Sequence, residues 1–128
     1  MELLIVAGFL GSGKTTMVLS AISRIIERTG KKVVIIVNDF GTVGIDGKLM
    51  EKYGLNVAEL ASGCICCTLG GDLLTTLQDI EEKIRPDLVV IEPTGLADPD
   101  AIVSALDHYP GKPLERIRSA VIVDAVRF

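Results

Sequence analysis

The chain has 128 residues, of which 48% are apolar, 4% aromatic and 23% charged, and its formal net charge is -4. This length suits one domain with a sizeable core, and the negative charge excludes a large sequence-independent attraction to nucleic acid or anionic membranes. No apolar run reaches the roughly 20 residues that span a bilayer, and no basic segment typical of a signal peptide precedes the first apolar run. We therefore expect a cytoplasmic protein with no nucleic-acid or membrane partner.

Strands and helices are expected to alternate along the chain, because continuous apolar runs alternate with apolar positions at helical spacing. The predicted strands are Leu3–Ala7, Lys32–Val37, Asn56–Leu60, Leu88–Ile91 and Ala120–Val123. The predicted helices are Lys14–Arg28, capped by Gly30, then Asp72–Ile84 and Pro99–Leu106, with a helical turn at Leu49–Tyr53. The glycine-containing segments 39–48 and 63–71 are predicted loops. The alternation implies one α/β domain over residues 1–128, with a mostly parallel sheet flanked by helices on both faces.

The segment GFLGSGKT at 8–15 fits the pattern of glycine, four residues, glycine, lysine and serine or threonine that cradles phosphates. Its glycines (Gly8, Gly11 and Gly13) allow backbone conformations and close approaches that a Cβ would forbid. The loop's N–H groups, Ser12 included, and the following helix N-terminus can surround phosphate oxygens. Lys14 supplies a cation for the β- and γ-phosphates, and the Thr15 hydroxyl can coordinate Mg²⁺. The segment follows a predicted strand and opens a predicted helix, so we interpret the chain as a P-loop nucleotide-binding domain.

Two acidic residues follow predicted strands, at the edge of the sheet where ligands bind in open parallel sheets. Glu92 could hold Mg²⁺ through water, and the backbone N–H of Gly95 could contact a γ-phosphate. Asp39 could bind Mg²⁺ or position the attacking water. The plainer interpretations are a solvated loop start for Glu92 and an Asx turn for Asp39. Asp87 precedes its strand and is expected to be an ordinary strand-start residue.

Three cysteines, Cys64, Cys66 and Cys67, lie within four residues. Thiolates suit Zn²⁺ or Cu⁺, and Cys-x-Cys lets two sulfurs point the same way on an extended chain. Three sulfurs do not complete a four-ligand structural zinc site, and the one histidine, His108, lies far along the chain. An open coordination position therefore favours transient binding and handover of a metal. The alternatives are buried, hydrophobic cysteines, which fit poorly with a polar glycine loop, and a strained Cys66–Cys67 disulfide.

Together these residues resemble the CobW-like metal-chaperone GTPases, relatives of the nickel-insertion GTPases HypB and UreG. The resemblance runs from about Leu3 to Phe128 and rests on motifs in a fixed order. They are GFLGSGKTT at 8–16, VNDFG at 37–41, GCICC at 63–67, IEPTGLADP at 91–99 and VIVDAVRF at 121–128.

The resemblance implies a GTPase that binds GTP or GDP with Mg²⁺, binds Zn²⁺ or Co²⁺, and delivers that metal to a target protein. It also implies a homodimer that forms with nucleotide and metal bound. It assigns phosphate and Mg²⁺ binding to Gly11, Gly13, Lys14, Thr15 and Thr16, the metal thiolates to Cys64, Cys66 and Cys67, and the Walker B motif to Glu92 and Gly95. Asp39 stands where the family usually has glutamate, so the expected catalytic residues are Lys14, Asp39 and Glu92.

The guanine-reading Asn-Lys-x-Asp motif of this family is absent from the chain, so we expect a GTPase domain truncated at its C-terminus. GTP as the nucleotide therefore rests on the resemblance alone. Two other functions stay open: a P-loop ATPase or small-molecule kinase whose cysteines are structural or redox-active, and a nucleotide-dependent binding module. No arginine near the motifs resembles a built-in arginine finger, which predicts slow intrinsic turnover.

Overall fold

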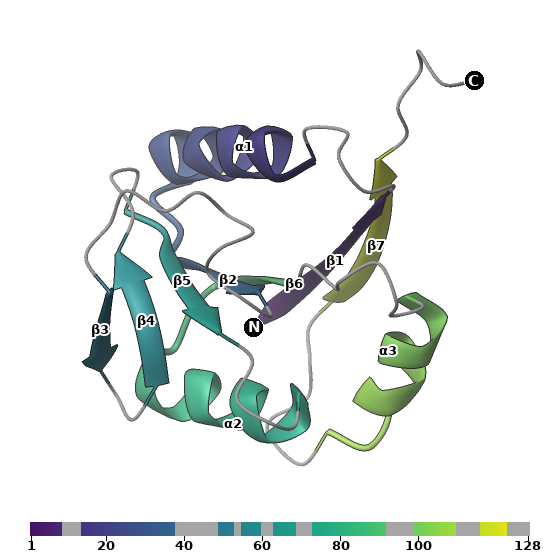
Figure 1. Ribbon diagram of the computed structural model, residues 1–128. Coiled ribbons are helices and arrows are strands. Elements are labelled where there is room, and N and C mark those ends of the chain that lie inside the picture. The colour runs from purple at the N-terminus through teal and green to yellow at the C-terminus, as the bar shows by residue number, and fades with distance from the viewer. Residues whose placement is uncertain are drawn as a thin grey trace.

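A computed structural model describes residues 1–8, 14–37, 49–52, 55–59, 63–68, 73–91, 99–109 and 116–122. The strands are β1 Glu2–Gly8, β2 Val33–Val37, β3 Leu49–Lys52, β4 Leu55–Glu59, β5 Ile65–Thr68, β6 Leu88–Ile91 and β7 Arg116–Ile122. The helices are α1 Lys14–Thr29, α2 Leu73–Lys83 and α3 Pro99–Leu106. Within the described residues, the strands form one sheet in the order β3-β4-β5-β2-β6-β1-β7 (Figure 1).

The sheet is mostly parallel, as the sequence predicts. β2 pairs in parallel with β5 and β6, and β1 pairs in parallel with β6 and β7. Only β4 runs against its neighbours, β3 and β5. Helix α1 covers one face of the sheet, whereas α2 and α3 cover the other (Figure 1). This is the α/β arrangement of a P-loop NTPase, so the predicted fold class is confirmed.

The core consists of two apolar clusters, one on each face of the sheet. The α1-face cluster contains Val6, Ile22, Val33, Ile35, Val37, Ala58, Cys64, Cys66, Leu88 and Val90. The α2-face cluster contains Leu3, Ile5, Val34, Ile36, Val57, Cys67, Leu77, Ile80, Ile84, Val89, Ile91 and Leu106. Alternate residues of β2 belong to alternate clusters, because successive side chains of a strand point to opposite faces. All five β2 residues are therefore buried.

The first two helices are each followed, within two residues, by a residue in the left-handed backbone region. Gly30 has φ of 66° and its N–H donates to the Ile26 carbonyl at 2.9 Å, which confirms the predicted cap of α1. After α2, Arg85 takes φ of 55° and its N–H donates to the Ile80 carbonyl at 3.0 Å. Tyr109, just beyond α3, donates a hydrogen bond from its hydroxyl to Glu81 of α2. That bond joins the two helices on their shared face of the sheet.

Three predicted elements differ from the structure. Residues 49–52 form β3, not a helical turn, because four residues are too few to nucleate a stable helix and pairing with β4 supplies their hydrogen bonds. Residues 65–68 form β5 within the predicted loop 63–71, because their backbone pairs with β2 and β4 while Cys66 and Cys67 are buried in the core on the two faces of the sheet. β7 begins at Arg116, four residues before the predicted start, since an edge strand tolerates charged side chains.

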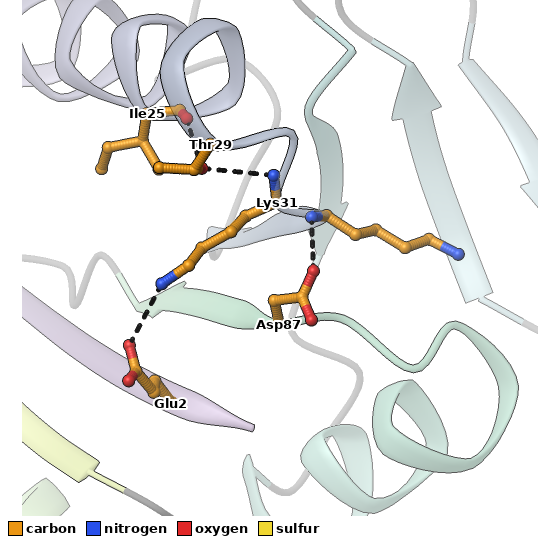
Figure 2. A network of polar contacts seen from close by, with 6 residues as sticks. Glu2, Ile25, Thr29, Lys31 and Asp87 are labelled. Carbon is orange, nitrogen blue, oxygen red and sulfur yellow. Dashed lines mark hydrogen bonds and ion pairs between the residues drawn. The ribbon is translucent and has the colours of Figure 1, made fainter.

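Polar contacts hold together the starts of β1, β2 and β6, at the edge of the sheet where the parallel strands begin (Figure 2). The Lys32 N–H donates to the Asp87 carboxylate at 2.9 Å, and the Asp87 N–H donates to the Lys32 carbonyl at 2.9 Å. The Glu2 N–H donates to the Asp87 carbonyl at 3.0 Å, and Lys31 Nζ lies 3.9 Å from the Glu2 carboxylate. Asp87 therefore ties the starts of β1, β2 and β6 together, which confirms its expected role at a strand start.

Among the described helices, none is long and apolar enough to cross a membrane.

Candidate nucleotide and metal site

The parallel strands bring the predicted site segments to one edge of the sheet. β1, β2, β5 and β6 run in the same direction, with Ile5 and Ile36 both in register with Ile91. The C-terminal ends of these strands therefore share one edge, the edge that binds ligands in open α/β sheets. The phosphate loop starts where β1 ends at Gly8, Asp39 is two residues beyond β2, and Glu92 is one residue beyond β6.

The phosphate loop joins β1 to α1, as the motif requires. Gly8 is the last residue of β1, and Lys14, Thr15 and Thr16 form the first turn of α1. The backbone N–H groups of a first helical turn have no partners within the helix and carry partial positive charge, which suits a phosphate. The other predicted residues of this site lie outside the described residues: Gly11, Ser12, Gly13, Asp39, Glu92 and Gly95.

Cys66 and Cys67 lie in β5, and Cys64 directly precedes it. β5 pairs with β2, and β2 separates it from β6. Each of the three cysteines is 0% exposed. Cys64 and Cys66 belong to the α1-face cluster, whereas Cys67 belongs to the α2-face cluster. The split follows from strand geometry, because residues 66 and 67 are consecutive in β5 and must point to opposite faces. The structure therefore shows cysteines that are buried in the core. This is the alternative that fitted poorly with the predicted polar loop, and the prediction of a loop at 65–68 was wrong.

Burial also controls the protonation of Cys64 and Cys67, and none of the three cysteines forms a disulfide. Loss of solvent raises the pKa of Cys64 to about 12, although a backbone hydrogen bond at Ile35 acts in the opposite direction. Loss of solvent raises the pKa of Cys67 to about 12 as well, with a further increase from the nearby Cys64. The Cys64 thiol donates to the Ile65 carbonyl at 3.7 Å. At neutral pH both groups are thiols, so a metal must displace their protons.

The structure does not bring three metal ligands together in the part of the chain that it describes. No group of three histidine, cysteine or acidic side chains there could hold a metal ion. His108 is exposed in the turn that follows α3. The predicted role of Cys64, Cys66 and Cys67 as metal ligands thus stays a prediction, but they occupy two faces of a strand and not one loop.

Sequence reasoning missed the division of the cysteines and the contact between Tyr109 and Glu81. The first had a signal, because Ile65–Thr68 is a short, mostly apolar run that could have been assigned to a buried strand. The second had none, because its partners are separated by 28 residues.

Comparisons with known proteins agree with a nucleotide-binding domain. The family model described as "CobW/HypB/UreG, nucleotide-binding domain" matches residues 2–128. The chain is 37% identical over 129 residues to a zinc chaperone CobW of Sinorhizobium sp, covering 95% of this chain and 34% of the relative. It is 35% identical over 119 residues to the zinc chaperone YeiR of Escherichia coli, covering 93% and 36%. It is 31% identical over 135 residues to zinc-regulated GTPase metalloprotein activator 1 of Dictyostelium discoideum, covering 95% and 28%.

Two solved structures have the same fold. The Zn(II)-bound YjiA GTPase from E. coli matches with a TM-score of 0.63 and 30% identity, covering 93% of this chain and 39% of that one. A Zn(II)-bound triple mutant of YjiA, in which one glutamate and two cysteines are alanine, matches with a TM-score of 0.60 and 31% identity, covering 96% and 40%. The chain thus spans between about a quarter and two fifths of the length of these proteins. Its matched residues, its motifs and its sheet order together place it in the CobW/HypB/UreG family, as a nucleotide-binding domain.

Proposed function

We propose that this chain is the nucleotide-binding part of a metal-chaperone GTPase. It binds GTP, hydrolyses it slowly to GDP, and binds Zn²⁺ or Co²⁺ for delivery to a target protein. The observation that carries the proposal is the shared sheet edge. There β1, which precedes the phosphate loop, β2, which precedes Asp39, and β6, which precedes Glu92, all end beside the cysteine strand β5. Hydrolysis at that edge can then time the release of a metal bound at β5, the strand next to β2.

The nucleotide half of the site uses positioning and charge. In this proposal Lys14 binds the β- and γ-phosphates, and Gly8, Gly11, Ser12, Gly13, Thr16 and Gly95 offer backbone or hydroxyl contacts to phosphate oxygens. The Thr15 hydroxyl and the carboxylates of Asp39 and Glu92 are oxygen donors, which suit Mg²⁺. Mg²⁺, when bound, neutralises charge that develops on the phosphates. Asp39 orients the attacking water, and without an arginine finger the turnover is slow.

The metal half relies on the three thiols. Zinc and cobalt accept thiolate ligands, and three cysteines leave a coordination position open for handover. Relatives named zinc chaperones, and a solved GTPase named as Zn(II)-bound, support a metal role for this chain. We further propose a metal-receiving protein as the partner, a homodimer that forms with nucleotide and metal, and action in the cytoplasm.

The nucleotide half is tested by single-turnover hydrolysis of GTP and ATP with Mg²⁺. Lys14→Ala should lower the rate by roughly 100-fold or more, because one preorganised charge on the phosphates is lost. Lys31→Ala is the matched control, because Lys31 lies at the N-terminal edge beside Glu2 and should leave the rate unchanged. Equal loss in both variants, or fast turnover of the unmodified chain with and without Zn²⁺, would contradict the proposal.

The metal half is tested by titrating Co²⁺ into the unmodified chain and a Cys64/Cys66/Cys67 triple-alanine variant, with and without Mg²⁺ and GTP. A thiolate-to-cobalt charge-transfer band should appear only when the cysteines are present. The variant is essential because zinc remains in a YjiA triple mutant that lacks two cysteines, so zinc content alone does not identify thiolate binding.

One observation favours a second function, a P-loop NTPase with no role in metal delivery. All three thiols are buried in the core, as cysteines with a purely structural role would be. The absence of a charge-transfer band in the cobalt titration would select this function.

A further inference from the structure

Cys66 and Cys67 are separated by the sheet. Cys66 is in register with Ile35 of β2 and Ala58 of β4, and all three belong to the α1-face cluster. Cys67 is in register with Ile36 and Val57, and these belong to the α2-face cluster instead. Neither cysteine is exposed. The two thiols thus lie in separate halves of the core, with the β5 backbone between them.

A metal ion cannot bind both of these thiols while β5 keeps its present form. Zinc–sulfur bonds are about 2.3 Å long, so two sulfurs on one tetrahedral ion lie within about 4 Å of each other. Consecutive residues of a paired strand direct their side chains to opposite faces. Cys64 and Cys66, by contrast, are two residues apart and share the α1-face cluster. These two thiols therefore lie on the same side of the sheet, and both are buried there.

β5, which carries Cys66 and Cys67, is short, and a glycine with positive φ precedes it. β5 has four residues, and it is held by parallel pairing with β2 on one side and antiparallel pairing with β4 on the other. The chain enters through Gly63, which has φ of 91° and open space where a Cβ would stand. Few backbone hydrogen bonds must break for residues 66–68 to leave the sheet, so local opening costs less there than in a longer interior strand.

We infer that a metal bound by Cys67 together with Cys66 opens the C-terminal half of β5. In the closed sheet, Cys64 and Cys66 lie on the same face, and Cys67 joins them on one metal ion only after its pairing with β2 and β4 breaks. This inference rests on the proposed metal role of the cysteines. It adds a regulatory step. When a metal binds all three thiols, β5 is partly unpaired, whereas in the metal-free protein it is paired with both β2 and β4.

Opening of β5 removes pairing partners from the end of β2, the strand that precedes Asp39. Cys67 pairs with Ile36 and Thr68 pairs with Val37, the last residue of β2. Unpairing residues 67 and 68 therefore frees one side of the segment that precedes the predicted nucleotide-sensing loop. Since coupling between two sites is reciprocal, the nucleotide that alters this end of β2 must alter metal affinity by the same factor that metal alters nucleotide affinity.

The experiment is amide hydrogen exchange measured by mass spectrometry on the whole chain, with Zn²⁺ added and with Mg²⁺ alone as the control. The same preparations are titrated with Co²⁺ to record the charge-transfer band. Zn²⁺ should accelerate exchange about tenfold or more in peptides that contain residues 65–68 and 34–37, but not in β1 or β6. Cys67→Ala, and the bulkier Cys67→Val as a check on folding, should bind Co²⁺ with a weaker band and show no acceleration.

Three results would overturn the inference. A band that depends on Cys67 while exchange at residues 65–68 stays unchanged would show that the closed strand suffices. A band that is identical in Cys67→Ala would show that this thiol takes no part. No band in the unmodified chain would overturn the metal role as well, and in the first two cases that role survives.

Discussion

β2 and β5 are adjacent parallel strands that differ in burial and in amino-acid composition. β2 is built from valine and isoleucine only, and all five of its residues are buried. β5 has two buried cysteines at its centre, between partly buried Ile65 and Thr68. A cysteine contributes a smaller apolar surface than isoleucine, so β5 gives the core less stabilisation in the same position. The comparison indicates that β2 holds the sheet together, whereas β5 can be opened at lower cost.

The largest expected effect distinguishes two residues in register, Ile36 of β2 and Cys67 of β5. Ile36→Ala should lower the free energy of unfolding by about 2–5 kcal/mol, because it leaves a cavity in the α2-face cluster. Cys67→Ala removes one heavy atom and should cost only about 1 kcal/mol. Urea unfolding measures both, and Ile36→Val provides a milder variant that is certain to remain within the measurable range. Equal costs for the two alanine variants would make β5 an ordinary core strand.

The next effect concerns the entry into β5. Gly63→Ala should destabilise the chain by about 1–2 kcal/mol, because the φ of 91° is unfavourable for a residue with a Cβ. No atom lies within 4 Å of the added Cβ, so the cost is one of backbone conformation alone. Gly63→Asn should recover part of the loss, since asparagine tolerates positive φ better. Thermal unfolding of the two variants checks this, and an unchanged midpoint for alanine would refute the strain.

A smaller effect is expected at the start of β2. Asp87→Ala should cost about 1 kcal/mol, because the Lys32 N–H loses its carboxylate acceptor. Since β2 is fixed at this end, hydrogen exchange should accelerate in peptides of β2 more than in those of β5. Lys31→Ala, which removes only a partly exposed ion pair with Glu2, is the control and should cost less than about 1 kcal/mol. Faster exchange in β5 than in β2 would contradict the assigned role of Asp87.

An effect of similar size concerns the helices that cover Cys67. Tyr109→Phe should cost about 0.5–1.5 kcal/mol at neutral pH, through loss of the hydrogen bond to Glu81. Burial, and then this hydrogen bond and the charge of Glu81, raise the pKa of Tyr109 above its ordinary value near 10. Its contribution is therefore complete below pH 10 and is lost as the pH rises through the higher folded-state value.

Unfolding of the unmodified chain and the Tyr109→Phe variant at pH 8 and pH 11 checks this sign. The stability difference between them should shrink at the higher pH. A difference that grows with pH would show that Tyr109 is not the group responsible.

The prediction of the fold from the sequence was most accurate where a local pattern coincides with the final structure. The helix Lys14–Arg28 and its cap at Gly30 were predicted, because amphipathic spacing and a terminal glycine are local signals. The strand at 88–91 was predicted with its exact bounds, because a buried central strand is apolar throughout. The segment 49–52 was assigned incorrectly, since its strand conformation depends on pairing with β4.

For the candidate site, the sequence by itself determined which chemical groups are present and their order along the chain. The glycine-rich loop with Lys14, the acids Asp39 and Glu92, and the three cysteines follow from residue identity and spacing. Only the tertiary structure decided where the thiols point. Pairing of β5 with β2 and β4 fixes its register, and that register places Cys66 on one face of the sheet and Cys67 on the other. Such pairing joins residues far apart in the chain, so the short apolar run at 65–68 could indicate a strand but not which face of the sheet each thiol takes.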